Sequence, residues 1–228
     1  VFWTGKPDTM RIFETRRDDS WPAKAAIGQA AASMIEDHDT ILLDGGSTTY
    51  ELARQLVGRP LQVVTNSLPV SHLLSTSDSI NLVMIGGCVR GSTAVAIWPM
   101  ADSMLATINV GKAFLSVAGV TERGYFNSNM MLVESEKAML AAADQAIVVA
   151  DSSKFGRVSL SRLCGLQEVS ALVTDPDLDS QWKQWLETAG VVLVLASASA
   201  GSWPLSWGSG PEGVTRIGEC SQQQESDQ

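Results

Sequence analysis

Small polar residues and glycines follow four short apolar runs of the chain, and these positions could bind a ligand. The segments are Asp44-Gly45-Gly46-Ser47-Thr48-Thr49, Thr65-Asn66, Gly86-Gly87 and Asp151-Ser152-Ser153-Lys154. Glycine lets a ligand approach the backbone, while hydroxyl groups and the amides that begin a helix are hydrogen-bond donors. With the charge of Lys154, these donors suit a phosphate. Glycine, serine and threonine are also ordinary turn and helix-capping residues, so this pattern alone leaves both interpretations open.

The charged residues near these segments also have two interpretations each. Asp44 would repel a phosphate, so we expect it either to accept hydrogen bonds from sugar hydroxyls or to hold its own loop through backbone amides. Lys154 could neutralise a phosphate or could be a solvated surface charge. Glu134 and Glu136 could transfer protons, or they could form the polar face of a helix.

Common catalytic and cofactor motifs are absent from the sequence. Neither a G-x-G-x-x-G after residues 40–43 nor a G-x-x-x-x-G-K-[ST] occurs. His38 and His72 are expected in a polar turn and on a helix, which does not favour a nucleophilic triad. Cys88, Cys164 and Cys220 are widely spaced and far from both histidines, so they predict neither a disulfide framework nor a zinc site. We therefore expect no cofactor and no metal.

The elements that must position these residues alternate in type along the chain. Apolar runs predict strands at 40–43, 61–66, 80–87, 112–120, 145–150, 169–175 and 191–196, and helical spacing predicts helices at 23–35, 50–57, 67–76, 99–109, 131–143 and 179–190. Strands without polar alternation are expected where helices cover both faces of a parallel sheet. The sequence therefore predicts an α/β fold: a Rossmann-like, doubly wound, mostly parallel sheet with helices on both faces. Ligands of such sheets bind beyond the carboxyl ends of the strands.

Two helices and two loops of this scheme carry more specific expectations. Inward-facing residues should be Met100, Met104 and Leu105 on the first helix and Leu132, Met139 and Leu140 on the second. The Gly/Asn-rich segment 122–129 and the segment 151–160 are predicted to be loops.

The composition of the 228-residue chain indicates one globular domain that does not bind DNA by itself. The chain is 45% hydrophobic, and its 16 Lys and Arg against 25 Asp and Glu give a formal net charge of −9. This charge opposes attraction to phosphate backbones. Because no run of eighteen apolar residues and no signal-peptide pattern occurs, we expect a cytoplasmic protein without a membrane partner. Val1 in place of an initiator methionine suggests a processed or excised chain.

Several segments together resemble the sugar-sensing domain of DeoR-type bacterial transcriptional repressors. They are TILLDGGSTTYELARQL, VVTNSLPV, VMIGG, KAFLSVAGV, EKAM and VVADSSKFGRVS, and the resemblance covers residues 12–195. The resemblance implies a domain similar in fold to ribose-5-phosphate isomerase A and coenzyme A transferases. It also implies that operator DNA is bound only through an N-terminal winged helix-turn-helix, and that the regulator is a homo-oligomer.

The resemblance implies an effector site for a phosphorylated sugar. The phosphate would lie near Gly46, Ser47, Thr48 and Thr49, with the rest of the pocket formed by Asp44, Gly45, Thr65, Asn66, Gly86, Gly87 and Lys154. The family usually has an acidic residue shortly before the KAF strand, where this chain has Asn109, Val110 and Gly111. This departure weakens the alternative function, a sugar-phosphate aldose-ketose isomerase in which Glu134 or Glu136 would shuttle a proton and Lys154 would stabilise an enediolate.

These inferences divide the chain into three parts. Residues 1–20 are expected to be the remnant of an interdomain linker, and residues 21–196 the sugar-phosphate sensor domain. Residues 197–228, rich in Ser, Gly, Pro and Gln, are expected to form a mobile tail.

Overall fold

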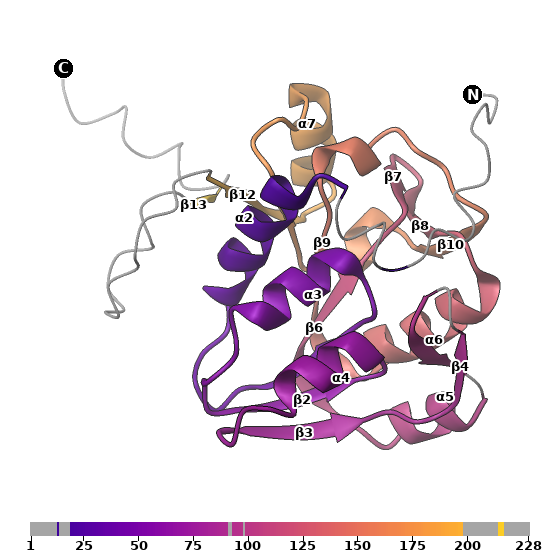
Figure 1. The fold of residues 1–228 in the computed structure, drawn as a ribbon. Helices are drawn as coiled ribbons and strands as arrows, with labels where there is room; N and C mark the ends of the chain where they lie inside the picture. Colours follow the sequence, from indigo (N-terminus) through magenta and orange to yellow (C-terminus); the bar gives the residue numbers. More distant parts are fainter. Residues whose placement is uncertain (1–12, 14–18, 91–92, 98, 198–213, 217–228) are drawn as a thin grey trace.

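The computed structural model describes residues 13, 19–90, 93–97, 99–197 and 214–216 (Figure 1). Its centre is an eight-stranded sheet in the order β13-β12-β11-β9-β6-β1-β2-β3. The strands are β1 (Thr40–Leu43), β2 (Leu61–Thr65), β3 (Ile80–Met84), β6 (Val110–Ser116), β9 (Ala143–Val149), β11 (Ala171–Thr174), β12 (Val192–Ala196) and β13 (Val214–Arg216). All neighbours pair in parallel except β12 and β13, which are antiparallel.

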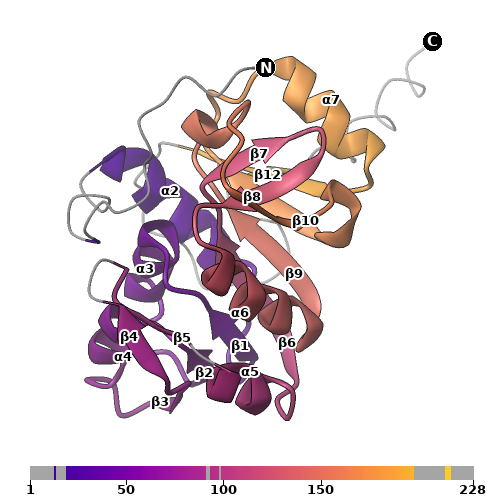
Figure 2. The same ribbon diagram turned by 90° about the vertical axis from the view of Figure 1, so that its right-hand side faces the viewer.

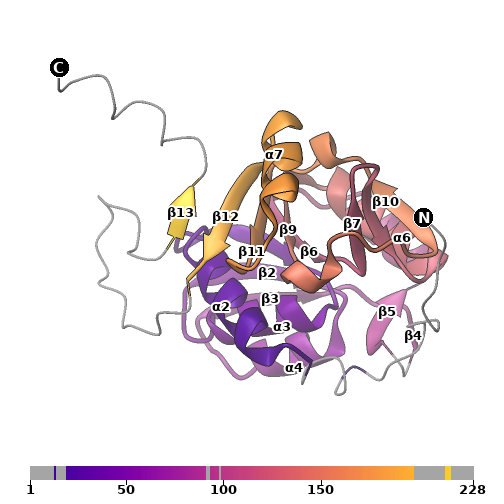
Figure 3. The ribbon, with the colours of Figure 1, turned by 90° about the horizontal axis from the view of Figure 1, so that it is seen from above.

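Helices cover both faces of this sheet, which confirms the predicted fold class (Figures 2 and 3). One face carries α2 (Trp21–Ala32), α3 (Ser47–Arg54) and α4 (Leu68–Leu74), and the other carries α5 (Pro99–Leu105), α6 (Met130–Ala141) and α7 (Ser180–Thr188). Two apolar cores lie between these layers: Ile41 and Leu43 belong to one, and Leu42 to the other. Successive strand residues point to opposite faces, so a strand between two cores must be apolar throughout.

The chain changes direction across the sheet between β1 and β6. From β1 it adds β2 and β3 on one side, and it then returns to place β6 on the other side of β1. Leu42 accordingly pairs with Val64 of β2 and with Ala113 of β6. Such a reversal leaves a crevice at the carboxyl ends of the two central strands, which is where ligands of doubly wound sheets bind.

Two small sheets, which the sequence analysis did not predict, adjoin this crevice. One is the hairpin of β4 (Cys88–Arg90) and β5 (Val95–Ile97), and the other has the order β10-β8-β7, from β7 (Gly119–Thr121), β8 (Gly124–Asn127) and β10 (Ser161–Cys164). The strand expected at 112–120 therefore ends at Ser116 and resumes as β7. The expected loops are corrected too, because 122–129 contains β8, and 151–160 begins with the 3-10 turn η1 (Ser152–Lys154) and leads into β10.

The helix faces differ in part from the expectation. Leu105 and Met139 are buried, but Met104 is 36% exposed, on the outer side of α5. The side chain of Met100 lies outside the described part of the chain. On α6 the fully buried positions are Val133, Ser135, Glu136 and Met139, with Leu132 and Leu140 half-buried. A polar stretch of this helix therefore faces the interior.

The expectations about the two ends of the chain fall mostly outside the described residues. Of the expected linker 1–20, the structure describes Phe13, Asp19 and Ser20, and of the expected tail it describes Ser197 and the strand β13. In the described part of the chain, no helix is long and apolar enough to cross a membrane.

Candidate functional site

A polar cavity lies at the carboxyl ends of β1 and β6, where the strand order reverses. Its wall consists of Asp44, Gly45, Gly46, Thr93, Val95, Ser116, Asn127, Leu132 and Glu136. The cavity is small: its volume is about 30 Å³, well below the range of about 300–1,000 Å³ for small-molecule sites. Figure 2 shows the elements that meet here, with α6 lying beside β6 and β9.

Asp44 ties the ends of β1 and β6 together. Its Oδ1 accepts hydrogen bonds from the Gly46 amide at 2.9 Å and from Thr49 Oγ1 at 2.7 Å. Its Oδ2 accepts from the Ser116 amide at 2.8 Å and from Ser116 Oγ at 3.1 Å. Burial raises the pKa of Asp44, while these hydrogen bonds favour the ionised form. The structure therefore gives Asp44 the loop-holding role that the sequence offered as one alternative.

The loop after β1 requires glycine for steric reasons. A Cβ on Gly46 would lie 1.7 Å from Ser116 Oγ, and a Cβ on Gly45 would lie 1.7 Å from Val95 Cγ1. An alanine at either position would therefore fit only if Val95 or Ser116 moved. Both glycines line the cavity as predicted, and each brings the backbone against a strand from a different part of the chain.

Glu136 and Asn127 form the opposite wall, and neither was assigned to the effector site from the sequence. Asn127 Nδ2 donates to Glu136 Oε1 at 2.7 Å and Oε2 at 2.8 Å, and to the Ser116 carbonyl at 3.2 Å. Asn127 Oδ1 accepts from the Ala118 amide at 2.8 Å. Burial, and secondly the charge of Asp44, raise the pKa of Glu136 well above its ordinary value. Glu136 is thus a buried acid in the cavity and not part of a solvated helix face.

Glu134 and Lys137 lie elsewhere on the same helix. They are exposed and form an ion pair at 2.9 Å, as expected of a polar helix face. Of the two interpretations of these acids, the polar helix face therefore holds for Glu134 and does not hold for Glu136, which is buried. A helix turns about 100° per residue, so Glu134 and Glu136, two residues apart, point to opposite faces of α6.

The residues after β2 hold the β4–β5 hairpin against the cavity. Asn66 Nδ2 donates to the Ala96 carbonyl at 3.2 Å, and the Ala96 amide donates to the Asn66 carbonyl at 2.8 Å. Thr65 Oγ1 donates to the Leu43 carbonyl at 2.8 Å and accepts from the Ser67 amide. These contacts place Val95 on the cavity wall, whereas Thr65 and Asn66 do not line it.

The first turn of α3 follows directly from the cavity. Ser47, Thr48 and Thr49 are all buried, and Thr49 Oγ1 is engaged with Asp44 and with the Gly46 carbonyl at 2.8 Å. Within the described residues no hydrogen bond uses the hydroxyl of Ser47 or Thr48. These two hydroxyls adjoin Gly46 on the cavity wall, although they are not part of the lining.

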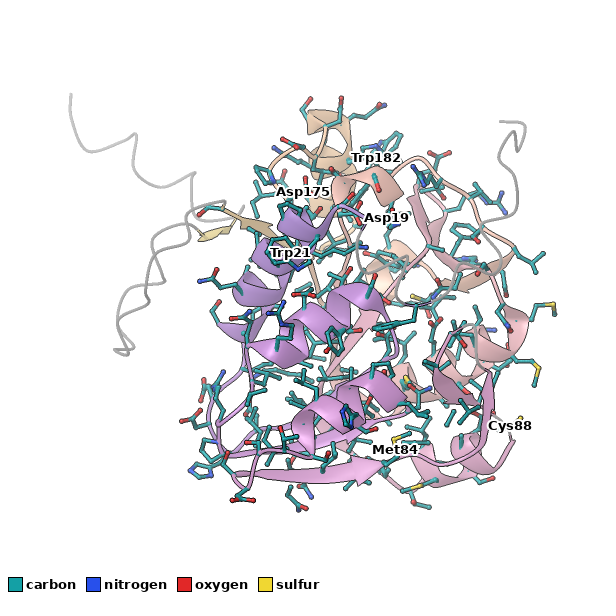
Figure 4. The ribbon with its side chains drawn as sticks, in the orientation of Figure 1. Asp19, Trp21, Met84, Cys88, Asp175 and Trp182 are labelled. Atoms are coloured by element: carbon teal, nitrogen blue, oxygen red, sulfur yellow. The ribbon has the colours of Figure 1, made fainter. Side chains whose placement is uncertain are left out.

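The remaining predicted site residues lie apart from the cavity. Gly86 and Gly87 follow β3, the edge strand of the sheet, and both are exposed. Figure 4 labels Met84 and Cys88, which lie on either side of them in the sequence, and it shows both far from Asp175, which follows β11. Lys154 follows β9, and its Nζ is 4.0 Å from Asp151 Oδ2. Its turn adjoins β11, since the Ser152 amide donates to Asp175 at 2.6 Å. Of the eleven predicted residues, the cavity brings together Asp44, Gly45 and Gly46.

The chemistry of the cavity is that of a hydrogen-bond acceptor. Two buried carboxyl groups and a serine line it, and no lysine or arginine is among its described lining residues. A phosphate would be repelled by this wall, whereas hydroxyl and amine groups could donate to it. Among the described residues there is no group of three or more His, Cys, Asp or Glu side chains that could hold a metal ion.

Comparisons with known proteins agree on a class of bacterial regulators. A family model described as the DeoR C terminal sensor domain matches residues 20–176, more than half of the chain. The uncharacterized HTH-type transcriptional regulator YulB of Bacillus subtilis is 36% identical over 177 residues, which cover 77% of this chain and 69% of that protein. IolR of the same bacterium is 30% identical over 81% of this chain and 74% of its own length. UlaR of Escherichia coli is 26% identical over 81% and 72%.

Similar solved structures include enzymes and translation factors. Ribose 5-phosphate isomerase A from Methanocaldococcus jannaschii matches with a TM-score of 0.42 and 21% identity, over 58% of this chain and 53% of that chain. The eIF2B delta subunit from Chaetomium thermophilum matches with a TM-score of 0.48 and 15% identity, over 68% and 56%. The chain thus spans about half the length of these proteins.

Proposed function

We propose that this chain, which belongs to the DeoR family of transcriptional regulators and comprises its C-terminal sensor domain, binds a phosphorylated sugar or a related metabolite as its effector. The observation that carries the proposal is the buried acceptor cavity at the strand-order reversal, formed by Asp44, Ser116, Asn127 and Glu136. Burying two carboxyl groups in a protein core is unfavourable unless hydrogen bonds or a bound ligand compensate them. Several sugar hydroxyls, each a donor, match this acceptor cavity.

The phosphate of the effector is proposed to lie outside the acidic cavity, at the amino end of α3. Ser47 and Thr48 offer hydroxyls that no described residue uses, and the helix dipole favours an anion there. Lys154, in the turn that follows β9, is proposed to add a charge-assisted contact from the other side of β6. The sugar would then point inward and the phosphate outward.

Ligand binding at this position would connect four elements. Asp44 holds the end of β1 to the end of β6, and Asn127 of β8 contacts both β6 and α6. A ligand that binds one arrangement of these elements more tightly shifts the population toward it. We propose that this shift controls an operator-bound repressor in the cytoplasm, in which a homo-oligomer contacts DNA through winged helix-turn-helix domains and this chain supplies the sensor.

One observation favours a second candidate, an aldose-ketose isomerase. Glu136 is an acid in the cavity, and burial raises its pKa, as it does for many general acids in enzymes. The proposed partner Lys154 does not line the cavity, and Glu134 is exposed and paired with Lys137. Turnover of pentose or hexose phosphates at about 1 per second or faster would support the enzyme. We expect none.

Calorimetry with a panel of sugar phosphates and the matching free sugars tests the sensor function. We expect saturable binding of at least one sugar phosphate and weak binding of its free sugar. Lys154→Ala should weaken that affinity about ten- to a hundredfold and Thr48→Ala about fivefold. Lys137→Ala, which removes an exposed lysine on α6, is the matched control and should change nothing. Unchanged affinity in both variants would contradict the phosphate site, and no binding across the panel would contradict the function.

A further inference from the structure

The carboxyl group of Glu136 is buried without a basic partner in the described part of the chain. Buried Glu51 is paired with Arg54 at 2.9 Å, and buried Asp151 lies 4.0 Å from Lys154. Glu136 has instead only the Asn127 amide, at 2.7 and 2.8 Å. An isolated buried carboxylate is strongly disfavoured unless a cation or several donors compensate it.

Glu136 retains unused capacity to accept hydrogen bonds. A carboxylate has about four acceptor positions, and both hydrogen bonds that Glu136 accepts come from one nitrogen, Asn127 Nδ2. Asp44 differs in this respect, because backbone amides and hydroxyls already donate to both of its oxygens. Of the two acids in the cavity, Glu136 is therefore the one that can engage a ligand without giving up an existing contact.

The electrostatic surroundings of Glu136 favour a positively charged ligand group over a neutral one. The titratable groups that act on it are Asp44 at the end of β1 and Cys164 of β10, while Asn127 and Ser116 do not titrate. Burial and the charge of Asp44 raise the pKa of Glu136. A cation in the cavity would be attracted to Asp44 and would favour release of the Glu136 proton, so that both acids could compensate it, whereas a hydroxyl group offers no charge to stabilise an ionised Glu136.

We propose that Glu136 determines the specificity of the site, and that the effector carries a protonated amine beside its hydroxyl groups, as a phosphorylated amino sugar does. This inference rests on the proposed function and names the ligand class of the same cavity. A primary ammonium has three donors and a compact charge. It can therefore donate to Glu136 while it lies near Asp44.

A divalent metal ion fits the cavity less well. Calcium and magnesium take six or more oxygen ligands, and no metal-holding group of three His, Cys, Asp or Glu side chains occurs among the described residues. A sugar phosphate with a hydroxyl group in place of the amine is the other alternative, called neutral below because that one group is uncharged, and it differs from its amino counterpart in that group only. The two can therefore be compared directly.

The test measures affinities of the whole 228-residue chain by calorimetry. The probes are glucosamine 6-phosphate and galactosamine 6-phosphate. Each is compared with its hydroxyl counterpart, glucose 6-phosphate or galactose 6-phosphate, and with its N-acetyl derivative, in which the amine carries no charge. We expect at least one amine to bind about tenfold or more tightly than both neutral partners, the effect of one charge-assisted contact. Glu136→Gln should reduce that preference to about threefold or less. Glu134→Gln, on the exposed side of α6, is the control and should preserve it.

Each outcome decides between the possibilities. Equal or tighter binding of the neutral sugar phosphates by the wild-type chain would overturn the inference while leaving the proposed function intact, as would a preference that survives Glu136→Gln. Binding of no probe and no other sugar phosphate would overturn both. Should Glu136→Gln not fold, the wild-type chain alone decides. Titrations in two buffers of different ionisation enthalpy should then show proton release with the amine and none with its hydroxyl counterpart.

Discussion

Removing the side chain of Asn127 should destabilise the fold, and most of the effect should depend on Glu136. Asn127→Ala removes the donor to the Glu136 carboxyl group and the donor to the Ser116 carbonyl. It also removes one of the two acceptors of the Ala118 amide, which still donates to the Phe126 carbonyl at 2.9 Å. At a pH high enough to ionise Glu136, the bond to its carboxylate should contribute about 1.5–3 kcal/mol, and the neutral hydrogen bonds about 0.5–1.5 kcal/mol each. We therefore expect the free energy of unfolding to fall by about 3–5 kcal/mol.

A double-mutant cycle isolates the part that comes from Glu136. Replacing a buried, unneutralised acid with an apolar side chain of similar size, as in Glu136→Leu, is expected to be neutral or stabilising. In that background Asn127→Ala should cost only about 1–3 kcal/mol, because only the two neutral contacts are lost. The coupling energy between the two positions should thus be about 1.5–3 kcal/mol.

Urea denaturation followed by circular dichroism measures all four free energies. Equal m-values across the four chains would justify the comparison, since m reports the surface exposed on unfolding. A coupling energy below about 0.5 kcal/mol, the additivity expected of independent sites, would refute the account of Glu136 as a buried acid that depends on Asn127.

Three further predictions concern single substitutions. Because the raised pKa of Glu136 makes the folded chain hold its proton to higher pH than the unfolded chain, stability should fall as pH rises above the ordinary value of 4.5, and Glu136→Gln should flatten that fall in thermal melts between pH 5 and 8; an unchanged slope would contradict this. Tyr125→Phe removes a buried hydroxyl that has no hydrogen-bond partner among the described residues, and it should raise the free energy of unfolding by about 1 kcal/mol; a loss of that size in urea titrations would be the opposite result. Gly124→Ala should destabilise by more than about 3 kcal/mol, because Gly124 has φ +117° and a Cβ would lie 2.0 Å from the Cys164 carbonyl oxygen; a tolerated alanine would show that the β8–β10 contact is looser than described.

The central layer of the fold could be predicted because its strands are apolar on both faces. Residues 40–43 were expected as a strand and form β1, and the runs near 145–150 and 191–196 form β9 and β12. Short strands in small sheets carry no such signal. Gly124–Asn127 forms β8 although glycine and asparagine dominate its surroundings, because β8 is fixed by pairing with β7 and β10.

The candidate site could be predicted only where it is local in sequence. Asp44, Gly45 and Gly46 follow a strand directly, and that position brings them to the cavity. Glu136 and Asn127 reach it through tertiary packing of α6 and β8. A signal for Glu136 was present, since it lies three residues before Met139 on the buried face of α6, but the neighbouring Glu134 and Lys137 suggested a solvated surface.

The most direct test of the central claim is an NMR titration of the isotopically labelled chain with the sugar phosphate that binds most tightly in calorimetry. If the effector occupies the cavity between β1 and β6, the amides of Gly45, Gly46 and Ser47 and the side-chain amide of Asn127 should shift together and saturate at the calorimetric affinity. Saturable shifts confined to other parts of the chain, with these signals unmoved, would contradict the assignment of the effector site to this cavity.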